Sequence, residues 1–199
     1  MKLFDKWETT NISHMDPGLY KYMNLEEKII PHTFGATNKE SSRKTKINLI
    51  ERLVNKMMRS GQGKKKLSGK FVRHRWGCGK KEQMLKTVED AFEYIYKTTK
   101  QNPVQVLVTA VEYAAPREDI TKLQKGSITY TQSVDLAPIK RLDEALKNIA
   151  LACFKNTYKT KKETHIALAE EIIDAAKNDQ KSFSVKRKDE IERIAQGSR

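Results

Sequence analysis

Positive charge is concentrated in one quarter of this chain, between Lys39 and Lys86. This segment carries sixteen Lys and Arg residues against three acidic residues, whereas the rest of the chain carries 23 basic and 22 acidic residues. A segment with this much like charge repels itself unless a polyanion neutralises it. We therefore expect it to bind nucleic acid, an anionic membrane surface or an acidic protein.

The overall composition allows one folded domain with one modest core. Hydrophobic residues make up 38% of the 199 residues, below the ~45–50% usual in soluble domains. No run of ~18 apolar residues occurs, and the N-terminus lacks the apolar stretch of a signal peptide, so we expect no membrane span and no export. Cys78 and Cys153 are too few and too distant for a disulfide framework, which favours a cytoplasmic location. Cys153 falls on an apolar helical stripe, which is typical of a core residue.

Hydrophobic periodicity predicts a mainly α-helical fold with about six helices. We predict helices beginning near Ile47, over about 82–98, over 104–115, after Pro138, around 166–176 and over about 185–195. The third opens with Asn102, Pro103 and, three residues after the cap, Gln105, a sequence that predicts an N-cap, a proline in the first turn and a glutamine that bonds back to the cap. Ser184 is the expected N-cap of the last helix.

Between the third and fourth predicted helices, hydrophobic residues recur at every second position, which is the spacing of a β-strand. Alternating apolar residues from Ile128 to Leu136 follow the turn sequence Lys125-Gly126-Ser127 and a weaker strand, which predicts a β-hairpin over about 119–136. An isolated hairpin is marginally stable in water, so it is expected to lean on the helices or to project toward a partner. Residues 1–46 lack periodicity and predict an extended N-terminal region with a basic arm, while residues 47–199 form the helical domain.

No arrangement of residues in the sequence predicts an enzyme. Residues 61–65 resemble part of a phosphate loop but lack the preceding strand and the full spacing. His74 and Cys78 are only two ligands, too few for a closed zinc site. The acidic pairs Glu118-Asp119 and Glu170-Glu171 are expected beside loops or on solvated helix faces. We therefore expect no cofactor and no metal.

The basic segment favours nucleic acid over the other polyanions. Lys and Arg neutralise phosphates, and the aromatic residues Phe71 and Trp76 within the segment can stack on unpaired bases. The apolar face of the first helix is needed for the core, which disfavours a membrane surface. Taken alone, the residues leave open a structural RNA-binding protein, a nucleic-acid enzyme and a general DNA-binding protein. The long basic loop between the first two helices argues against a helix-turn-helix.

Several segments resemble one known family, the universal seventh protein of the small ribosomal subunit, which is family five in the older eukaryotic naming. The matching segments are 46–59, 91–96, 101–108, 116–119, 126–130, 134–142, 168–176, 186–190 and the final Ser198-Arg199. They are collinear and together span about Phe4 to Arg199. The extended N-terminus and the Ser-Arg ending resemble the archaeal and eukaryotic branch. The segment Phe71 to Lys81 departs from the family pattern, because it is longer and richer in glycine and aromatic residues.

The resemblance implies a bundle of about six helices with a protruding hairpin. Such a protein is not an enzyme; it binds the 3′ major domain of small-subunit ribosomal RNA (rRNA) and helps to nucleate assembly of the subunit head. The resemblance also implies a monomer that lies on the ribosome in the cytoplasm, without contact to a membrane. Its other implied partners are neighbouring head proteins and, beside the hairpin, the exit-site tRNA and messenger RNA.

The resemblance and the charge run together assign contacts to individual residues. The expected rRNA contacts are Arg43, Lys44, Lys46, Arg52, Asn55, Lys56, Arg59, Lys64, Lys65, Lys66, Arg73, Arg75, Arg117, Lys140, Arg141, Lys186, Arg187 and Lys188. The residues expected near tRNA and messenger RNA are Lys122, Lys125, Gly126, Tyr130 and Arg199. Gly126 would permit the turn of the hairpin. Tyr130 has an alternative role, which is to pack beneath the hairpin.

Overall fold

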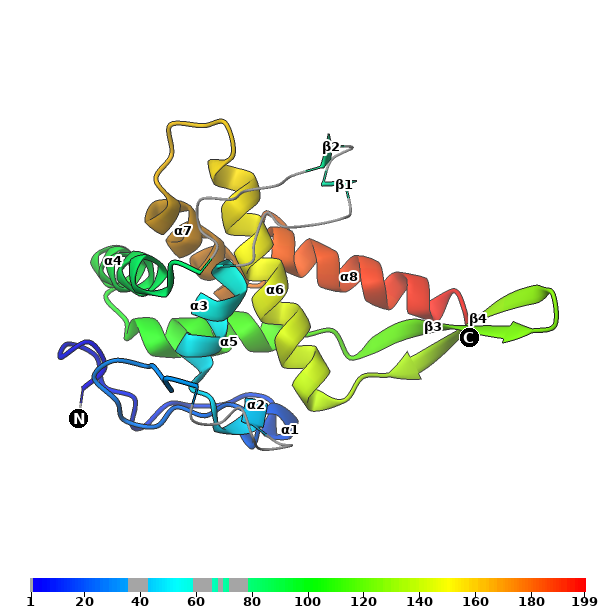
Figure 1. Cartoon of the computed structure of the whole chain (residues 1–199), viewed down its shortest axis with the longest axis horizontal. Helices are drawn as coiled ribbons and strands as arrows, with labels where there is room; N and C mark the ends of the chain where they lie inside the picture. Colours follow the sequence, from blue (N-terminus) through cyan, green and yellow to red (C-terminus); the bar gives the residue numbers. More distant parts are fainter. Residues whose placement is uncertain (1, 36–42, 59–65, 68–69, 72–78) are drawn as a thin grey trace.

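Six longer helices surround one core in the part of the chain that the structure describes, which is residues 2–35, 43–58, 66–67, 70–71 and 79–199 of a computed structural model (Figure 1). The helices are α1 (Pro17–Tyr20), α2 (Arg43–Lys46), α3 (Leu49–Met57), α4 (Lys81–Thr99), α5 (Pro103–Ala114), α6 (Pro138–Thr157), α7 (Thr164–Ala176) and α8 (Phe183–Gln196). The strands are β1 (Lys66–Leu67), β2 (Lys70–Phe71), β3 (Glu118–Lys125) and β4 (Ile128–Asp135). This architecture confirms the prediction of a mainly α-helical bundle with one protruding hairpin.

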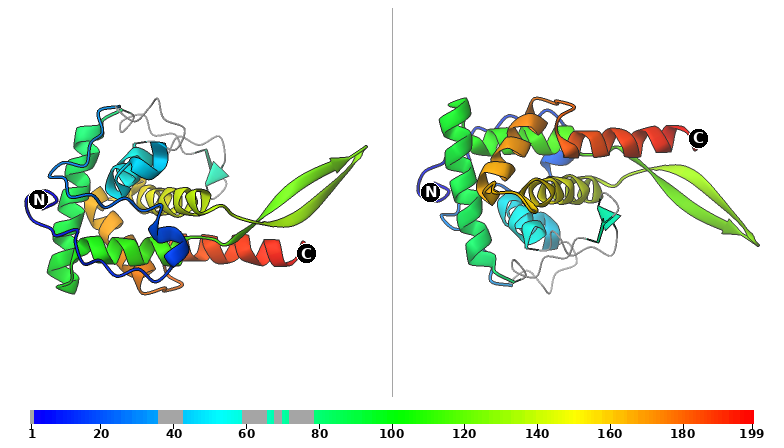
Figure 2. Two further views of the ribbon diagram at one scale, coloured as in Figure 1. Left: turned by 90° about the horizontal axis from the view of Figure 1, so that it is seen from below. Right: turned by 90° about the horizontal axis from the view of Figure 1, so that it is seen from above.

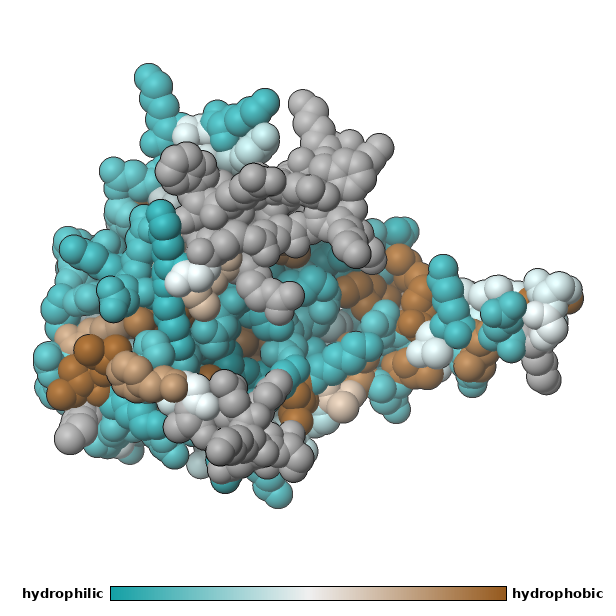
Figure 3. Space-filling model, in the orientation of Figure 1, coloured by the Kyte–Doolittle hydropathy of each residue, from teal (hydrophilic) through white to brown (hydrophobic). Residues whose placement is uncertain are grey.

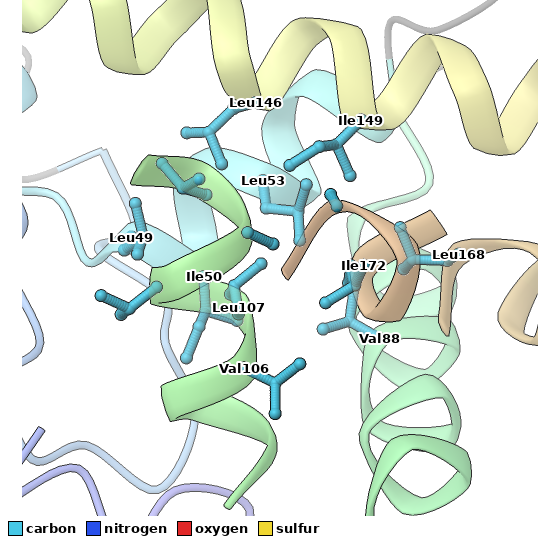
Figure 4. Packing of buried hydrophobic residues seen from close by; sticks show 14 of the residues in the cluster. Leu49, Ile50, Leu53, Val88, Val106, Leu107, Leu146, Ile149, Leu168 and Ile172 are labelled. Carbon is cyan, nitrogen blue, oxygen red and sulfur yellow. The ribbon is translucent and has the colours of Figure 1, made fainter. Parts of the chain in front are cut away.

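Helix α5 lies at the centre of the core and contacts α4, α6, α7 and α8. Figure 4 shows Leu107 of α5 among Leu53 of α3 and Ile172 of α7, with Leu146 of α6 nearby. All four side chains are completely buried. Burial of such a side chain contributes about 1.5–3 kcal/mol, so these contacts between helices are the main source of stability.

The start of α5 confirms part of the predicted capping. The Asn102 side chain accepts a hydrogen bond from the backbone N–H of Val104 at 3.0 Å, and Pro103 occupies the first turn. Gln105 does not bond back to the cap, so that prediction was wrong. Its side-chain amide instead binds the backbone of Ser13, which lies in the N-terminal region.

The N-terminal region belongs to the same core as the helices. Leu3, Leu19 and Met23 are buried in it, although the sequence around them lacks periodicity. The region crosses α4 and α5 (Figure 2), and Lys6 there forms ion pairs with Glu89 and Glu93 of α4 at 2.9 and 2.6 Å. Its extended course therefore depends on contacts with the helices and includes the two short helices α1 and α2.

Two predicted helix starts and one predicted loop differ from the structure. The first long helix begins at Leu49, two residues later than predicted, because the Asn48 side chain caps it by accepting from the Ile50 N–H at 2.9 Å. The last helix begins at Phe183 with Ser182, rather than Ser184, as its N-cap. The basic loop after the first long helix contains a short antiparallel pair of strands, β1 and β2.

The hairpin of β3 and β4 extends away from the helices on the side opposite α4 (Figure 2). Its eight residue pairs run from Glu118 opposite Asp135 to Lys125 opposite Ile128. The two-residue turn begins at Gly126, whose φ of +62° is strained for any residue with a Cβ. Positive φ at the first turn position alone is typical of a type II′ turn, so the glycine has the predicted role.

Candidate nucleic-acid interface

Three predicted contact residues converge on one carboxylate, that of Asp143 on α6. The Nζ atom of Lys44 on α2 lies 2.7 Å from Oδ2 of Asp143. From α3, Nη2 of Arg52 lies 3.2 Å and Nζ of Lys56 lies 3.4 Å from Oδ1. Three cations around one anion leave a local excess of positive charge. This group of four residues is called the Asp143 cluster below.

Exposure increases through the Asp143 cluster from the core to the surface. The exposed fraction of the side chain is 5% for Arg52, 19% for Asp143, 31% for Lys56 and 56% for Lys44. An ammonium group has three donors. Lys44 uses one of them in its hydrogen bond to Asp143, whereas Lys56 forms an ion pair with Asp143 at 3.4 Å. The two lysines therefore keep donors available for an anion from solution.

The surrounding cations lower the pKa of Asp143 below its ordinary value of 3.8. Burial of the carboxylate alone would raise the pKa. The hydrogen bond from Lys44 and the charges of Lys56 and Arg52 outweigh this effect. Asp143 is thus ionised at neutral pH and holds the cations by charge-assisted bonds.

Arg52 does not have the predicted position, because its side chain is buried. Its guanidinium donates to the backbone oxygen of Tyr22 at 3.1 Å and to Asp143. Both bonds join it to groups of the fold itself. Periodicity placed Arg52 on the polar face of the first helix, but α6 and the N-terminal region cover that face. Arg52 therefore holds Asp143 from the inside and does not face phosphates in this conformation.

The other predicted contacts of the basic segment are only partly described. Lys46 is exposed at the end of α2, and its backbone oxygen accepts a bond from the Asn24 side chain at 2.8 Å. Asn55 is half-buried on α3. For Arg43 and Lys66 the structure describes the backbone alone, in α2 and β1. Five predicted contacts, the candidate zinc ligands and the phosphate-loop-like segment lie outside the described residues: Arg59, Lys64, Lys65, Arg73, Arg75, His74, Cys78 and residues 61–65.

The tip of the hairpin presents polar, basic and apolar side chains to solvent. Tyr130 lies opposite Leu123, and its side chain is 52% exposed, so it does not pack beneath the hairpin. Ile128 lies on the same face, because residues two apart in a strand point the same way. Lys122 is exposed on the other face, and the backbone of Lys125 precedes the turn.

Contacts with α6 and with α8 and its C-terminal end fix the base of the hairpin. The carboxylate of Glu192 on α8 accepts from the backbone N–H of Arg117 at 2.9 Å, and Arg199 forms an ion pair with Glu118. Lys140 on α6 lies 3.5 Å from Asp119. Figure 3 shows hydrophobic residues at this base and along the hairpin, with hydrophilic and neutral ones between them. Arg199, predicted near tRNA and messenger RNA, therefore lies at the base of the hairpin and not at its tip.

Arg141 and the basic residues 186–188 of α8 complete the predicted set. Arg141 is mostly buried, and it donates to Asp16 at 2.8 Å and to the backbone oxygen of Pro116 at 3.2 Å, which ties the N-terminal region to α6. Lys186 is exposed, Arg187 pairs with Glu190 at 2.5 Å, and Lys188 lies 3.5 Å from Asp189. Because α8 begins at Phe183, Lys186 alone of the three lies in the first turn, so the helix dipole opposes Lys186 but has little effect on Arg187 and Lys188.

Glu171, predicted on a solvated helix face, is buried and fixes the start of α8. Its carboxylate accepts from the hydroxyl groups of Ser182 and Ser184 at 2.7 and 2.8 Å, and from the backbone N–H of Ser184 at 2.9 Å. Cys153 is buried as predicted, and burial together with the charge of Glu171 raises the pKa of its thiol to about 12. A thiol with this pKa is not a nucleophile at neutral pH.

Within the described ranges, the structure shows no group of three or more His, Cys, Asp or Glu residues that could hold a metal ion. Among the helices in the same ranges, none is long and apolar enough to cross a membrane.

Sequence reasoning missed Asp143 and the anchors of the N-terminal region. Asp143 lies beside Glu144 on an amphipathic helix, and nothing in its spacing distinguishes it from a solvated acid. Glu112 accepts from the Met15 N–H at 3.2 and 3.1 Å, although it occurs in a helix that is mostly apolar. A polar residue in a predicted buried helix is the one signal that could have revealed such an anchor.

Comparison with known proteins places the chain in one family. The model for "Ribosomal protein S7p/S5e" matches residues 19–199. The "Small ribosomal subunit protein uS7" of Methanococcus aeolicus is 44% identical over 200 aligned positions, which cover all of this chain and 99% of the relative. The protein of the same name from Thermoplasma volcanium is 42% identical over 197 positions, covering 99% of this chain and all of the relative. Both relatives are archaeal, in agreement with the branch that the sequence resembles. The chain therefore belongs to the ribosomal protein S7p/S5e family, and the prediction that it is not an enzyme is confirmed.

Proposed function

We propose that this protein is a structural component of the small ribosomal subunit that binds the 3′ major domain of its rRNA. It helps to nucleate assembly of the subunit head, where neighbouring head proteins contact it. Its hairpin lies near the exit-site tRNA and the path of messenger RNA. It acts on the ribosome in the cytoplasm, as a single copy, without a cofactor.

The observation that carries this proposal is the excess of positive charge around Asp143. Lys44 and Lys56 reach the surface there from two separate elements, and both keep donors for phosphate oxygens. The basic residues before and after α3 extend this charge along the sequence. Neutralisation of phosphates by such groups releases counterions, which makes binding tight and dependent on salt.

The hairpin supports a second contact of a different kind. Its exposed tip places Tyr130 beside Leu123 and Ile128, with Lys122 on the opposite face. An exposed aromatic ring can stack on an unpaired base, and the lysines can bind the backbone of the same strand. Single-stranded messenger RNA and the loops of tRNA offer unpaired bases of this kind.

Competition binding at ~0.2 M salt tests the proposal, because non-specific electrostatic binding is much weaker there. Labelled 3′ major domain rRNA would compete with equal lengths of unrelated rRNA, tRNA and duplex DNA. We expect the 3′ major domain to bind ~10³-fold more tightly than each competitor. Equal binding of all four would contradict the proposal and would indicate a general nucleic-acid binder.

A further inference from the structure

We infer that Asp143 is a positioning residue for RNA binding, which fixes the lysines of α2 and α3 for contact with phosphate oxygens. This inference rests on the proposed function and assigns a role to an acidic residue within a basic surface. A negative charge beside a site for RNA would ordinarily weaken binding by repulsion. The geometry of the Asp143 cluster indicates the opposite effect.

The first observation concerns how Asp143 is held. Its carboxylate is fixed from the core side by the guanidinium of Arg52, which is itself bound to the backbone oxygen of Tyr22. Arg52 is 5% exposed, and its guanidinium is bound both to Tyr22 and to Asp143, so movement of this side chain is restricted. Asp143 is therefore a rigid acceptor at the surface and not a freely rotating side chain.

The second observation concerns α2, which has only four residues. A single helical turn is unstable in water, so contacts with the rest of the fold must hold it. Two such contacts are the ion pair of Lys44 with Asp143 and the bond from the Asn24 side chain to the backbone oxygen of Lys46. Asp143 thus connects the basic arm to the helical domain.

The third observation concerns the two lysines. Lys44 binds Oδ2 and Lys56 binds Oδ1 of the same carboxylate, so the two ammonium groups are held near each other in spite of their mutual repulsion. Ordering of long side chains before binding removes part of the entropic cost of association. A phosphate group that contacts both ammonium groups at once is therefore bound at a lower entropic cost. A phosphate bound by freely moving lysines elsewhere on the surface incurs the full cost.

The test compares Asp143→Asn with Glu144→Gln, which removes the neighbouring negative charge from the same helix. Glu144 pairs with Lys147 at 2.6 Å and does not contact the basic arm in the described structure. The affinities for 3′ major domain rRNA and for unrelated RNA of equal length would be measured at ~0.2 M salt. We expect Asp143→Asn to lower the preference for the 3′ major domain by about tenfold. Glu144→Gln would leave the preference within about twofold, since it only adds net positive charge.

A double-mutant cycle separates positioning from a general loss of structure. In a Lys44→Ala background, Asp143→Asn should have a smaller effect on the preference, because only Lys56 remains to be positioned. Asp143→Glu, which keeps the charge, should restore most of the preference. Lys44→Ala truncates an exposed side chain and should therefore fold even if Asp143→Asn does not. Amide exchange of α2 in this variant reports on the ion pair between Lys44 and Asp143.

The outcomes distinguish the inference from the proposed function. A wild-type protein without preference for the 3′ major domain contradicts the proposed function itself. A wild-type protein with that preference, together with an Asp143→Asn variant that keeps it or strengthens it, overturns the positioning role alone. Faster exchange of the α2 amides in Lys44→Ala supports the role, and unchanged exchange argues against it.

Discussion

The side-chain amide of Gln105 binds both backbone groups of Ser13, although 92 residues separate the two in sequence. The Ser13 N–H donates to Oε1 at 2.8 Å, and Nε2 donates to the Ser13 oxygen at 2.9 Å. The amide of Gln105 thus pairs with both backbone groups of one residue, as a neighbouring strand does in a β-sheet. It fixes the N-terminal region on α5 without a β-sheet.

Gln105→Ala removes both bonds, and we expect it to lower the free energy of unfolding by about 1–2 kcal/mol. Urea unfolding measures this change, and amide exchange at Ser13 should accelerate. Gln101→Ala, just before the same helix and exposed, is the matched control and should change stability by less than about 0.5 kcal/mol. Equal effects of the two substitutions would show that the contact with Ser13 contributes no stability.

Leu107→Ala creates a cavity at the centre of the core, where the side chain is completely buried. We expect a loss of about 2–5 kcal/mol in the free energy of unfolding. Leu123→Ala changes the same side chain on the exposed hairpin and should cost no more than about 1 kcal/mol. Thermal unfolding of the two variants compares the sites, and a hairpin variant as unstable as the core variant would contradict the assignment of α5 as the centre.

Glu171→Ala removes the acceptor of the Ser184 N–H and of the Ser182 and Ser184 hydroxyl groups, of which only one can donate to the other across 2.8 Å. Unsatisfied buried donors cost about 1–3 kcal/mol each, so we expect a loss of at least about 3 kcal/mol. Glu170→Ala is the control, because Glu170 is more exposed and pairs with Lys162 at the surface, where a pair contributes about 0–1 kcal/mol. Amide exchange at Val185 should increase in Glu171→Ala only, and protection that persists there would refute the capping role.

The pKa values of Asp16 and Asp143 predict how stability depends on pH. Burial alone would raise both, but the bond from Arg141 to Asp16 and the cations around Asp143 lower the pKa of each carboxyl below 3.8. A lowered pKa in the folded state adds stability above the ordinary value of the unfolded chain, and this stability is lost as pH falls through the folded value. Unfolding between pH 6 and 3 should therefore show stability falling below about pH 4.

The Asp143→Asn variant provides the control for this pH dependence. It should be less stable than the wild type at pH 6, and the difference should shrink as pH falls below 3.8, because the stability that comes from the lowered pKa of Asp143 is lost there. A constant difference between the two proteins across this range would mean that the charge of Asp143 does not stabilise the fold.

The sequence predicts the elements of this fold better than the contacts between them. Periodicity located six long helices and the hairpin, and Asn102 and Pro103 marked a helix start, because these signals are local. The choice between Ser182 and Ser184 as N-cap depended on Glu171, which lies on another helix and is invisible to local rules.

The candidate interface was predictable as a charged segment but not as an arrangement of groups. Lys44 and Arg52 look alike in a count of charges, yet one is exposed and the other buried. The difference arises because α6 brings Asp143 over α3, a contact between residues about ninety positions apart. The same kind of distant contact explains why Gln105 binds Ser13 and not its own cap.

RNA should bind where Lys44 and Lys56 reach the surface. The most direct measurement is the salt dependence of binding to 3′ major domain rRNA, for the wild type, for Lys44→Ala with Lys56→Ala, and for Lys97→Ala with Lys100→Ala at the end of α4. Loss of two phosphate contacts should make the slope of log K against log salt shallower by about 1.4–1.8 in the first double variant. The α4 double variant should keep the wild-type slope. Equal slopes in all three proteins, or an equal change in the two double variants, would contradict this placement of the interface.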